Sequence, residues 1–395
     1  MFLPQLKKYH HFFSYLFVAM LIIGGGFINL RLVQIGIPGF GLTVLNLSEE
    51  TVIIALFLLG ITACVSCICI GFVLEKHPIM FNEKKICFIV LTWLNTLLIY
   101  ITYFITDQLG YLLWVIIIGV YFGALSGIAY SLIFYLIPRN RRGGVAAILG
   151  GVMYFISASY PGDWSFEMFR DQSILIWPLI FGILGFFILF DVFDNGKIEI
   201  NQNLEPNFQI NAKPIIIILI LILFLDSFGF LRIIETQEIS SQMWLSNQSF
   251  KIYIGIIHLV SAIIIGVFYK KIGPFNTLIL SLFLFVIADF VIALIPFSET
   301  IRIIFPLLYA SAVSVYTLIL MSIFADISTK ETINRNTSIG FGLIGWFSAY
   351  TGTGLCYYFI YLNIPFSFHL IISGGIALTS IFIVLHFKYK SKRTE

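Results

Sequence analysis

The sequence predicts an all-α polytopic membrane protein, in which twelve transmembrane helices form two pseudo-symmetric six-helix bundles. The first observation is composition: of 395 residues, 59% are hydrophobic and only 11% are charged. Soluble domains carry about 25% charged residues, so a soluble enzyme with this composition could not cover its surface with polar groups. The second observation is length. A membrane-spanning helix needs about 20 apolar residues, which leaves room for roughly a dozen helices and short loops.

Apolar runs separated by charged and turn residues place these helices along the chain. The twelve candidate spans cover residues 12–35, 51–74, 86–106, 111–137, 144–162, 173–193, 214–234, 250–269, 275–296, 303–325, 339–361 and 366–387. The longest polar stretch, 194–213, has no apolar periodicity and follows the sixth span. We therefore expect an N-terminal bundle over 1–193, a linker over 194–213 and a C-terminal bundle over 214–395. This layout is typical of transporters built from two parallel repeats.

The distribution of basic residues predicts the orientation, because Lys and Arg are retained on the cytoplasmic side of a membrane. Of the 23 Lys and Arg residues, 18 lie in the N-terminal segment, the even-numbered loops and the C-terminal tail. The other five, in the opposite loops and the spans, are Arg31, Arg170, Arg232, Lys251 and Arg302. This asymmetry predicts a multi-pass protein of the plasma membrane with both termini in the cytoplasm, which requires an even number of spans.

Two short motifs after the second and eighth spans resemble those of the major facilitator superfamily. That family carries Gly-x3-Asp-x2-Gly-Arg after its second helix, with a weaker copy after the eighth. Here the first copy runs from Gly71 through Glu75 to Pro78, and the second from Gly266 to Gly273. The first keeps the acid and loses the second glycine, whereas the second copy keeps both glycines and loses the acid. The chain thus resembles a divergent member of this family, and the resemblance covers almost its whole length.

The resemblance implies a cytoplasmic gate, in which carboxylates at helix ends meet arginines on neighbouring helices. On this basis we expect Glu75 to pair with Arg139 or Arg142, and Asp326 to pair with Arg335. The alternative is that these residues only set the membrane topology. The family's proton-coupled members often carry an arginine inside the fourth helix, and this chain has none between 112 and 137. Drug/proton antiport is therefore disfavoured.

Few charged or titratable side chains fall inside the predicted spans, and a charge at the bilayer centre costs about 2.5–3.5 kcal/mol on insertion scales. They include Arg31, Asp226, Arg232, His258 and Asp289. Asp226 is near the middle of its span and can couple transport to a proton, pair with an arginine or neutralise a cationic substrate. His258 is its possible relay partner or a hydrogen-bonding lining residue. For Asp289 we expect a packing or interface role, because the ninth helix is peripheral in the family.

Arg31 and Arg232 occupy equivalent positions in the first and seventh spans, which line the central cavity in the family. Two guanidinium groups facing one cavity would bind a carboxylate or phosphate, with Asn29 and His258 as further substrate contacts. Alternatively, both arginines extend to the outer lipid headgroups. Further lining possibilities, most of them expected to be packing residues, are Asn95, Tyr130, Tyr154, Tyr316, Trp346 and Tyr350.

Small residues recur at helical spacing on two spans. Gly119, Gly123 and Gly127 share one helix face, as do Gly143 and Gly151 with the alanine at 147 between them. Such faces allow close helix packing. The string from Gly340 to Gly345 matches the dinucleotide-binding pattern but lacks its strand–helix context. We interpret this string as glycines that thin the backbone and allow helix movement. The cysteines at 64, 67 and 69 are interpreted as small helix-packing residues.

Together these features predict a secondary transporter of a small polar solute that works by alternating access. An organic anion is favoured over a neutral or cationic solute, and a proton is the candidate coupling ion. We expect no enzymatic activity, cofactor, metal or nucleic-acid partner, and a monomer in the lipid bilayer. Two alternatives stay open: a receptor or assembly factor on the same scaffold, and an intramembrane enzyme such as an acyltransferase. The sequence contains no metalloprotease, serine-hydrolase or Walker motif.

Overall fold

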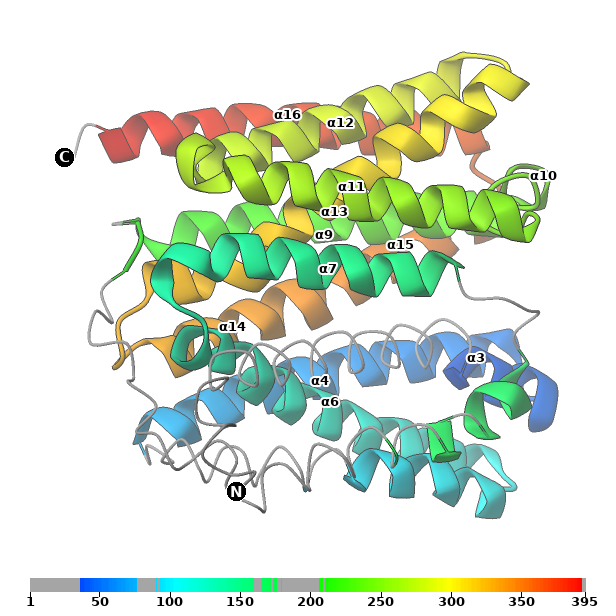
Figure 1. The fold of residues 1–395 in the computed structure, drawn as a ribbon. Helices are drawn as coiled ribbons and strands as arrows, with labels where there is room; N and C mark the ends of the chain where they lie inside the picture. The colour runs from blue at the N-terminus through cyan, green and yellow to red at the C-terminus, as the bar shows by residue number, and fades with distance from the viewer. Residues whose placement is uncertain are drawn as a thin grey trace, which may run out of the picture. The chain divides into compact units, whose positions relative to one another are not determined.

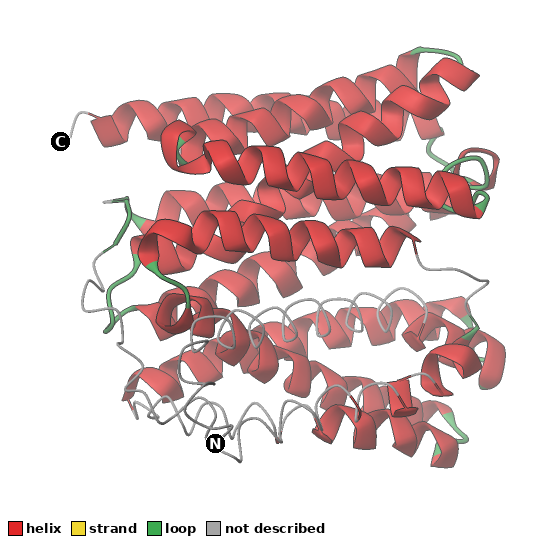
Figure 2. Ribbon diagram, viewed as in Figure 1, coloured by secondary structure: helices red, strands yellow, loops and turns green. Residues whose placement is uncertain are grey.

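The computed structural model describes residues 36–76, 90, 93–159, 165–171, 173–175, 179, 206–208 and 210–392. Over these ranges the chain is helical, with no strand (Figure 2). Packing divides the chain into two compact units, which are not continuous in sequence. Unit 1 comprises 1–140, 162–207 and 328–342, and unit 2 comprises 141–161, 208–327 and 343–395. The domain boundaries expected from the linker at 194–213 stay a prediction.

The polytopic fold class is confirmed. Among the described residues, eight helices are long and apolar enough to cross a membrane. They match eight predicted spans: those at 51–74, 111–137, 144–162, 214–234, 250–269, 275–296, 303–325 and 366–387. The predicted span 86–106 contains a shorter apolar helix, Trp93–Phe104. The predicted span 12–35 lies outside the described residues, as does almost all of 173–193.

Unit 1 contains the long helices α4 (Glu49–Lys76) and α6 (Gln108–Leu136) and the short helix α14 (Ile333–Phe341). Its smaller elements are α3 (Ile37–Gly39), a π-helix at Phe40–Val44 and a 3-10 helix at Ile101–Phe104. Helices α4 and α6 pack along each other (Figure 1). A Cβ atom on Gly123 would come within 2.7 Å of the Cys67 amide nitrogen, so only glycine permits this approach. The predicted glycine face of α6 is therefore a contact with α4.

Unit 2 contains α7 (Arg142–Ser159), α9 (Ala212–Glu235), α11 (Gln248–Ile272), α12 (Pro274–Leu294), α13 (Glu299–Ile327), α15 (Ala349–Tyr361) and α16 (Phe366–Lys392). Helix α13 is mostly buried and packs against α7, α9, α11 and α12 (Figure 1). The small-residue face of α7 packs on α11, where Ala147 approaches Gly266. The central position of α13 brings its polar side chains against three of the other long helices.

Local signals set several helix ends. Asn211 and Asn247 cap the starts of α9 and α11 with their side-chain oxygens, which accept the backbone N–H groups of Lys213 and Phe250. Gly273 has a φ of 79°, a left-handed conformation that separates α11 from α12. Pro274 then begins α12, where its missing N–H leaves no hydrogen bond unmade.

The predicted span 339–361 begins earlier than expected and is not a uniform helix. Helix α14 starts at Ile333, a π-helix covers Gly342–Ser348, and α15 continues to Tyr361. The polar residues of α14 had placed it in a loop, but its apolar side chains at Ile333 and Phe341 are buried. The π-helix overlaps the glycine-rich string at 340–345, so this string is part of a helix, as the sequence analysis expected.

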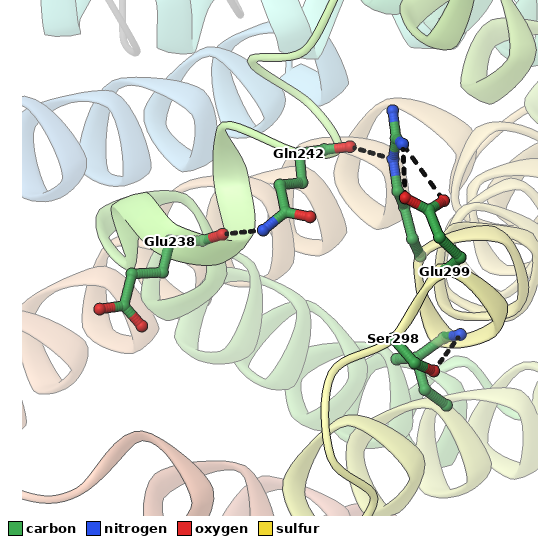
Figure 3. A network of polar contacts seen from close by, with 6 residues as sticks. Glu238, Gln242, Ser298 and Glu299 are labelled. Atoms are coloured by element: carbon green, nitrogen blue, oxygen red, sulfur yellow. Dashed lines mark hydrogen bonds and ion pairs between the residues drawn. The ribbon is translucent and has the colours of Figure 1, made fainter.

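The connection from α9 to α11 contains the short helix α10 (Gln237–Ser240) and is tied to the start of α13. Gln242 Nε2 donates to the Glu238 carbonyl over 3.0 Å, and Arg302 Nε donates to the Gln242 carbonyl over 2.9 Å. Glu299 and Ser298 complete this network at the first turn of α13 (Figure 3). We call this side of unit 2 the α10 end.

Candidate functional site

Asp226 is the centre of a polar cluster inside unit 2. It lies on α9, more than two turns before the helix ends at Glu235, and is half-buried. Tyr309 of α13 donates a hydrogen bond to Asp226 Oδ1 over 2.9 Å, and Tyr316 donates to Oδ2 over 2.5 Å. Hydrogen bonds to an ionised group are the strong ones, so two phenols stabilise this carboxylate. The arrangement suits a group that exchanges a proton.

His258 lies on α11 and contacts a different part of α13. Its Nδ1 is 2.9 Å from Ser314 Oγ, and its ring stacks on Tyr154 of α7 with the centroids 4.8 Å apart. Ser261 and Ser311 make a second hydroxyl contact between the same two helices at 2.7 Å. The sequence analysis expected His258 to be a relay partner of Asp226 or a hydrogen-bonding lining residue. In the structure it contacts a serine hydroxyl. Asp226 and His258 are thus both held by α13.

Sequence reasoning missed Tyr309, which contacts Asp226 directly. The available signal was spacing: Tyr309 and Tyr316 are seven residues apart and share one face of α13. Trp244, from the connection that contains α10, packs edge-on against Tyr309 at a centroid distance of 6.0 Å. This connection therefore contacts the tyrosine that binds Asp226.

Arg232 makes a contact within unit 2 near the end of α9. Its Nη2 donates to the Ile364 carbonyl over 2.8 Å, which fixes the loop between α15 and α16. Its Nε is buried and has no hydrogen-bond partner among the described residues. The other two members of the predicted anion site, Arg31 and Asn29, lie outside the described residues.

In unit 1, the structure pairs Glu75 with Arg335, a contact that the sequence analysis did not predict. Arg335 Nη1 lies 3.2 Å from Glu75 Oε1, and both side chains are partly exposed. The physical cause of this ion pair is the packing of α14 on α4. The expected pairs of Glu75 with Arg139 or Arg142, and of Asp326 with Arg335, stay predictions.

The register of α14 on α4 is set by close backbone approach. Cys67 Sγ donates to the Ser338 carbonyl over 3.3 Å, and the Asn334 side chain approaches the Leu74 carbonyl at 3.5 Å. A Cβ on Gly71 would come within 2.7 Å of Ser338 Oγ. Contacts at higher residue numbers on α4 are made to lower residue numbers on α14, so the two helices run antiparallel. Arg335 therefore lies opposite Glu75. The motif glycine Gly71 makes this contact possible.

The other residues predicted for the gate lie at loop and helix ends. Within unit 1, Arg139 Nε donates to Asn207 Oδ1 over 2.7 Å, and its Nη2 donates to the Pro206 carbonyl. Within unit 2, the fully buried Arg142 donates to the Ala325 carbonyl over 2.6 Å, next to Asp326. These contacts place polar groups near the linker and the end of α13. Their role in gating stays a prediction.

Comparison with known proteins identifies the fold. No family model and no curated protein sequence matches the chain. Among solved structures, one that matches is the major facilitator superfamily proton:xylose symporter XylE bound to 6-bromo-6-deoxy-D-glucose. The similarity covers 98% of this chain and 96% of that one, with a TM-score of 0.62 and 13% sequence identity. The chain therefore has the fold of the major facilitator superfamily, as its sequence motifs indicated.

Proposed function

We propose that this protein is a secondary active transporter of a small polar solute, which works by alternating access and uses Asp226 as its proton-coupling residue. The observation that carries the proposal is the carboxylate of Asp226, placed within a membrane span and bonded by Tyr309 and Tyr316. A charge inside the bilayer is expensive, so such a residue calls for a functional explanation. The shared fold with a proton:xylose symporter supports the same class of function.

Asp226 can couple two events because its two protonation states bind their neighbours differently. As a carboxylate it accepts from both tyrosines, whereas as a carboxylic acid it has one proton to donate and loses part of this acceptor capacity. A substrate that contacts Asp226 or its tyrosines then favours one state over the other. Binding of the solute and of the proton are thereby linked.

The class of solute is the second part of the proposal. An organic anion is favoured by the buried Nε of Arg232, an available donor on the same helix as Asp226, together with the predicted Arg31. A sugar is the neutral alternative, favoured by the aromatic and hydroxyl groups around His258, Tyr154 and Ser314. Both are small polar solutes, and one assay can compare them.

The test is uptake into proteoliposomes of D-xylose, lactate and succinate, each with and without an imposed pH gradient. We expect the wild-type protein to accumulate one of them only with the gradient. Asp226→Asn should abolish accumulation but retain exchange of labelled for unlabelled solute, because exchange needs no net proton movement. The matched control is Asp171→Asn, at an exposed carboxylate that accepts from Tyr103.

Two results would contradict the proposal separately. Gradient-driven accumulation that survives in Asp226→Asn would remove the proton role and leave transport in place. A wild-type protein that neither accumulates nor exchanges any of the three solutes would refute transport of these classes.

A further inference from the structure

Asp289 is a second buried carboxylate of unit 2 that the proposed function does not use. It lies on α12, within two turns of the helix end at Leu294, and is 1% exposed. Its side chain lies near Gly229 of α9 and Gly374 of α16, and the packing or interface role expected from the sequence stays a prediction. Since α12 ends where α13 begins, Asp289 is near the α10 end of the unit.

Three oxygens from three helices meet at one point beside Gly229 of α9. A Cβ atom built on Gly229 would lie 3.4 Å from Ser373 Oγ of α16, 3.8 Å from Tyr309 Oη of α13 and 3.9 Å from Asp289 Oδ1. Each is an ordinary van der Waals separation. All three oxygens therefore lie within 4 Å of the point that a side chain at Gly229 would occupy.

Two of these oxygens are buried without a hydrogen bond of normal geometry among the described residues: Asp289 Oδ1 and Ser373 Oγ. A buried polar atom without a partner is costly, and a buried charge costs more. A proton on Asp289 removes the charge and provides a donor for a neighbouring oxygen.

The other charged or titratable groups near Asp289 come from α9, α13 and α16. On α16, His369 Nε2 lies 3.0 Å from the Phe228 carbonyl. On α9, Arg232 is held by the loop before α16, and Asp226 is bonded by Tyr309 of α13. The Tyr309 hydroxyl thus bonds one carboxylate and lies beside the same point as an oxygen of the other.

We propose that Asp289 is a second proton-binding residue, which exchanges protons with Asp226 through the hydroxyl of Tyr309. The proposal rests on the proton role of Asp226 proposed above. In the transfer, the O–H bond of the Asp289 carboxylic acid breaks and its proton passes to the Ser373 hydroxyl, which releases its own proton to form a new O–H bond at Tyr309 Oη, while the original Tyr309 proton passes to Asp226 Oδ1. Asp289 ends as a carboxylate, Asp226 as a carboxylic acid, and Tyr309 as a neutral phenol.

The route fits the positions of the three groups. Asp289 is nearer the α10 end, and Asp226 is deeper along its helix. Ser373 Oγ lies beside the same point as Asp289 Oδ1 and Tyr309 Oη, so the proposed route uses its hydroxyl as the bridge between them. A proton that enters at the α10 end would therefore reach Asp289 before Asp226.

The experiment follows protonated carboxyl groups by time-resolved infrared spectroscopy of the purified full chain after a pH jump, with no solute present. Asp226→Asn and Asp289→Asn assign the carbonyl-stretch bands of the two acids. We expect Asp289→Asn to remove one band and to slow the appearance of the Asp226 band. The slowing should be about tenfold, since losing one hydrogen bond of typical strength raises a barrier by about that factor.

Gly229→Ala gives an independent test that leaves both carboxyl groups in place. Its methyl group would enter the point among the three oxygens at van der Waals distance, so the variant should fold while proton exchange slows by a similar factor. The matched control is Gly375→Ala on α16, where a Cβ meets no atom within 4 Å. If Gly229→Ala behaves like Gly375→Ala, or if Asp289→Asn removes no band, the relay is wrong.

The same spectra separate this proposal from the proposed function. An Asp226 band without an Asp289 band overturns the relay alone. A wild-type protein without any Asp226 band at any pH overturns both the relay and the proton role of Asp226.

Discussion

Replacing Gly71 by alanine should separate α14 from α4, because the new Cβ would overlap Ser338. The Cβ of Ser338 lies directly in the way, its Oγ would be 2.7 Å from the added atom, and the Asn334 carbonyl would be 3.2 Å away. A hydroxyl can rotate, but a Cβ and a carbonyl move only with their helix. Inserting a methyl group into such a contact costs about 1–3 kcal/mol.

One smaller term modifies this cost. Alanine is favoured over glycine in a helix interior by about 1 kcal/mol, which offsets part of the overlap. The net effect of Gly71→Ala is therefore a destabilisation of about 0–2 kcal/mol. Gly144→Ala is the control, because a Cβ there meets no atom within 4 Å and the substitution should be neutral or stabilising.

The compensating change is Ser338→Gly, which removes the Cβ that blocks Gly71→Ala. The double variant should be more stable than the sum of the single effects by about 1–2 kcal/mol, as expected for residues in direct contact. The assay is thermal unfolding of the purified protein in detergent, followed by tryptophan fluorescence. A change of 1 kcal/mol shifts the midpoint by roughly 2–4 °C in larger domains.

The result that would refute this reasoning is additivity. The effects of Gly71→Ala and Ser338→Gly on stability could be additive, or Gly71→Ala could have the same unfolding midpoint as Gly144→Ala. Either result would mean that α4 and α14 do not approach as closely as the structure indicates. The partner assigned to Glu75 would then lose its basis, because the same helix register places Arg335 opposite it.

Three further predictions concern the charged groups. Tyr316→Phe should lower gradient-driven uptake about tenfold or more, because a hydrogen bond to a charged group contributes about 1.5–3 kcal/mol. The control is Tyr253→Phe, outside the Asp226 cluster, and equal effects of the two variants would contradict the role of Tyr316. A double-mutant cycle of Glu75→Gln and Arg335→Gln, measured by unfolding in detergent, should give a coupling free energy of at most about 1 kcal/mol, since both side chains are partly exposed. A coupling free energy above roughly 2 kcal/mol would indicate a buried pair instead. Arg232→Gln should lower the unfolding midpoint with no anion present, because the bond to the Ile364 carbonyl is lost; an unchanged midpoint would favour a role in binding alone.

The fold was largely predictable because its signals are local. A run of about 20 apolar residues defines a span wherever it occurs, and eight such spans correspond to helices. Glycines at a spacing of four on α6 also predicted a packing face. Helix α14 was missed because its polar residues resemble a loop, and its burial depends on α4.

The candidate site was only partly predictable. Asp226 was identified because a carboxylate in a span is rare, which composition alone reveals. Its partner Tyr309 was missed because tyrosines are common in this chain, and only the rotation of α13 shows which of them face α9. Asp289 was assigned to packing because its helix is peripheral in the resembling family.

By itself, the sequence determined where this chain crosses the membrane and which few charged residues enter the spans, since hydrophobicity and length act on each segment separately. Only the tertiary structure decided which groups meet: Glu75 with Arg335, Asp226 with Tyr309 and Tyr316, and Asp289 with the oxygens beside Gly229. The physical reason is that contacts between helices depend on their rotation and axial register. These are set by close packing over whole helix faces, and no spacing within one segment specifies them.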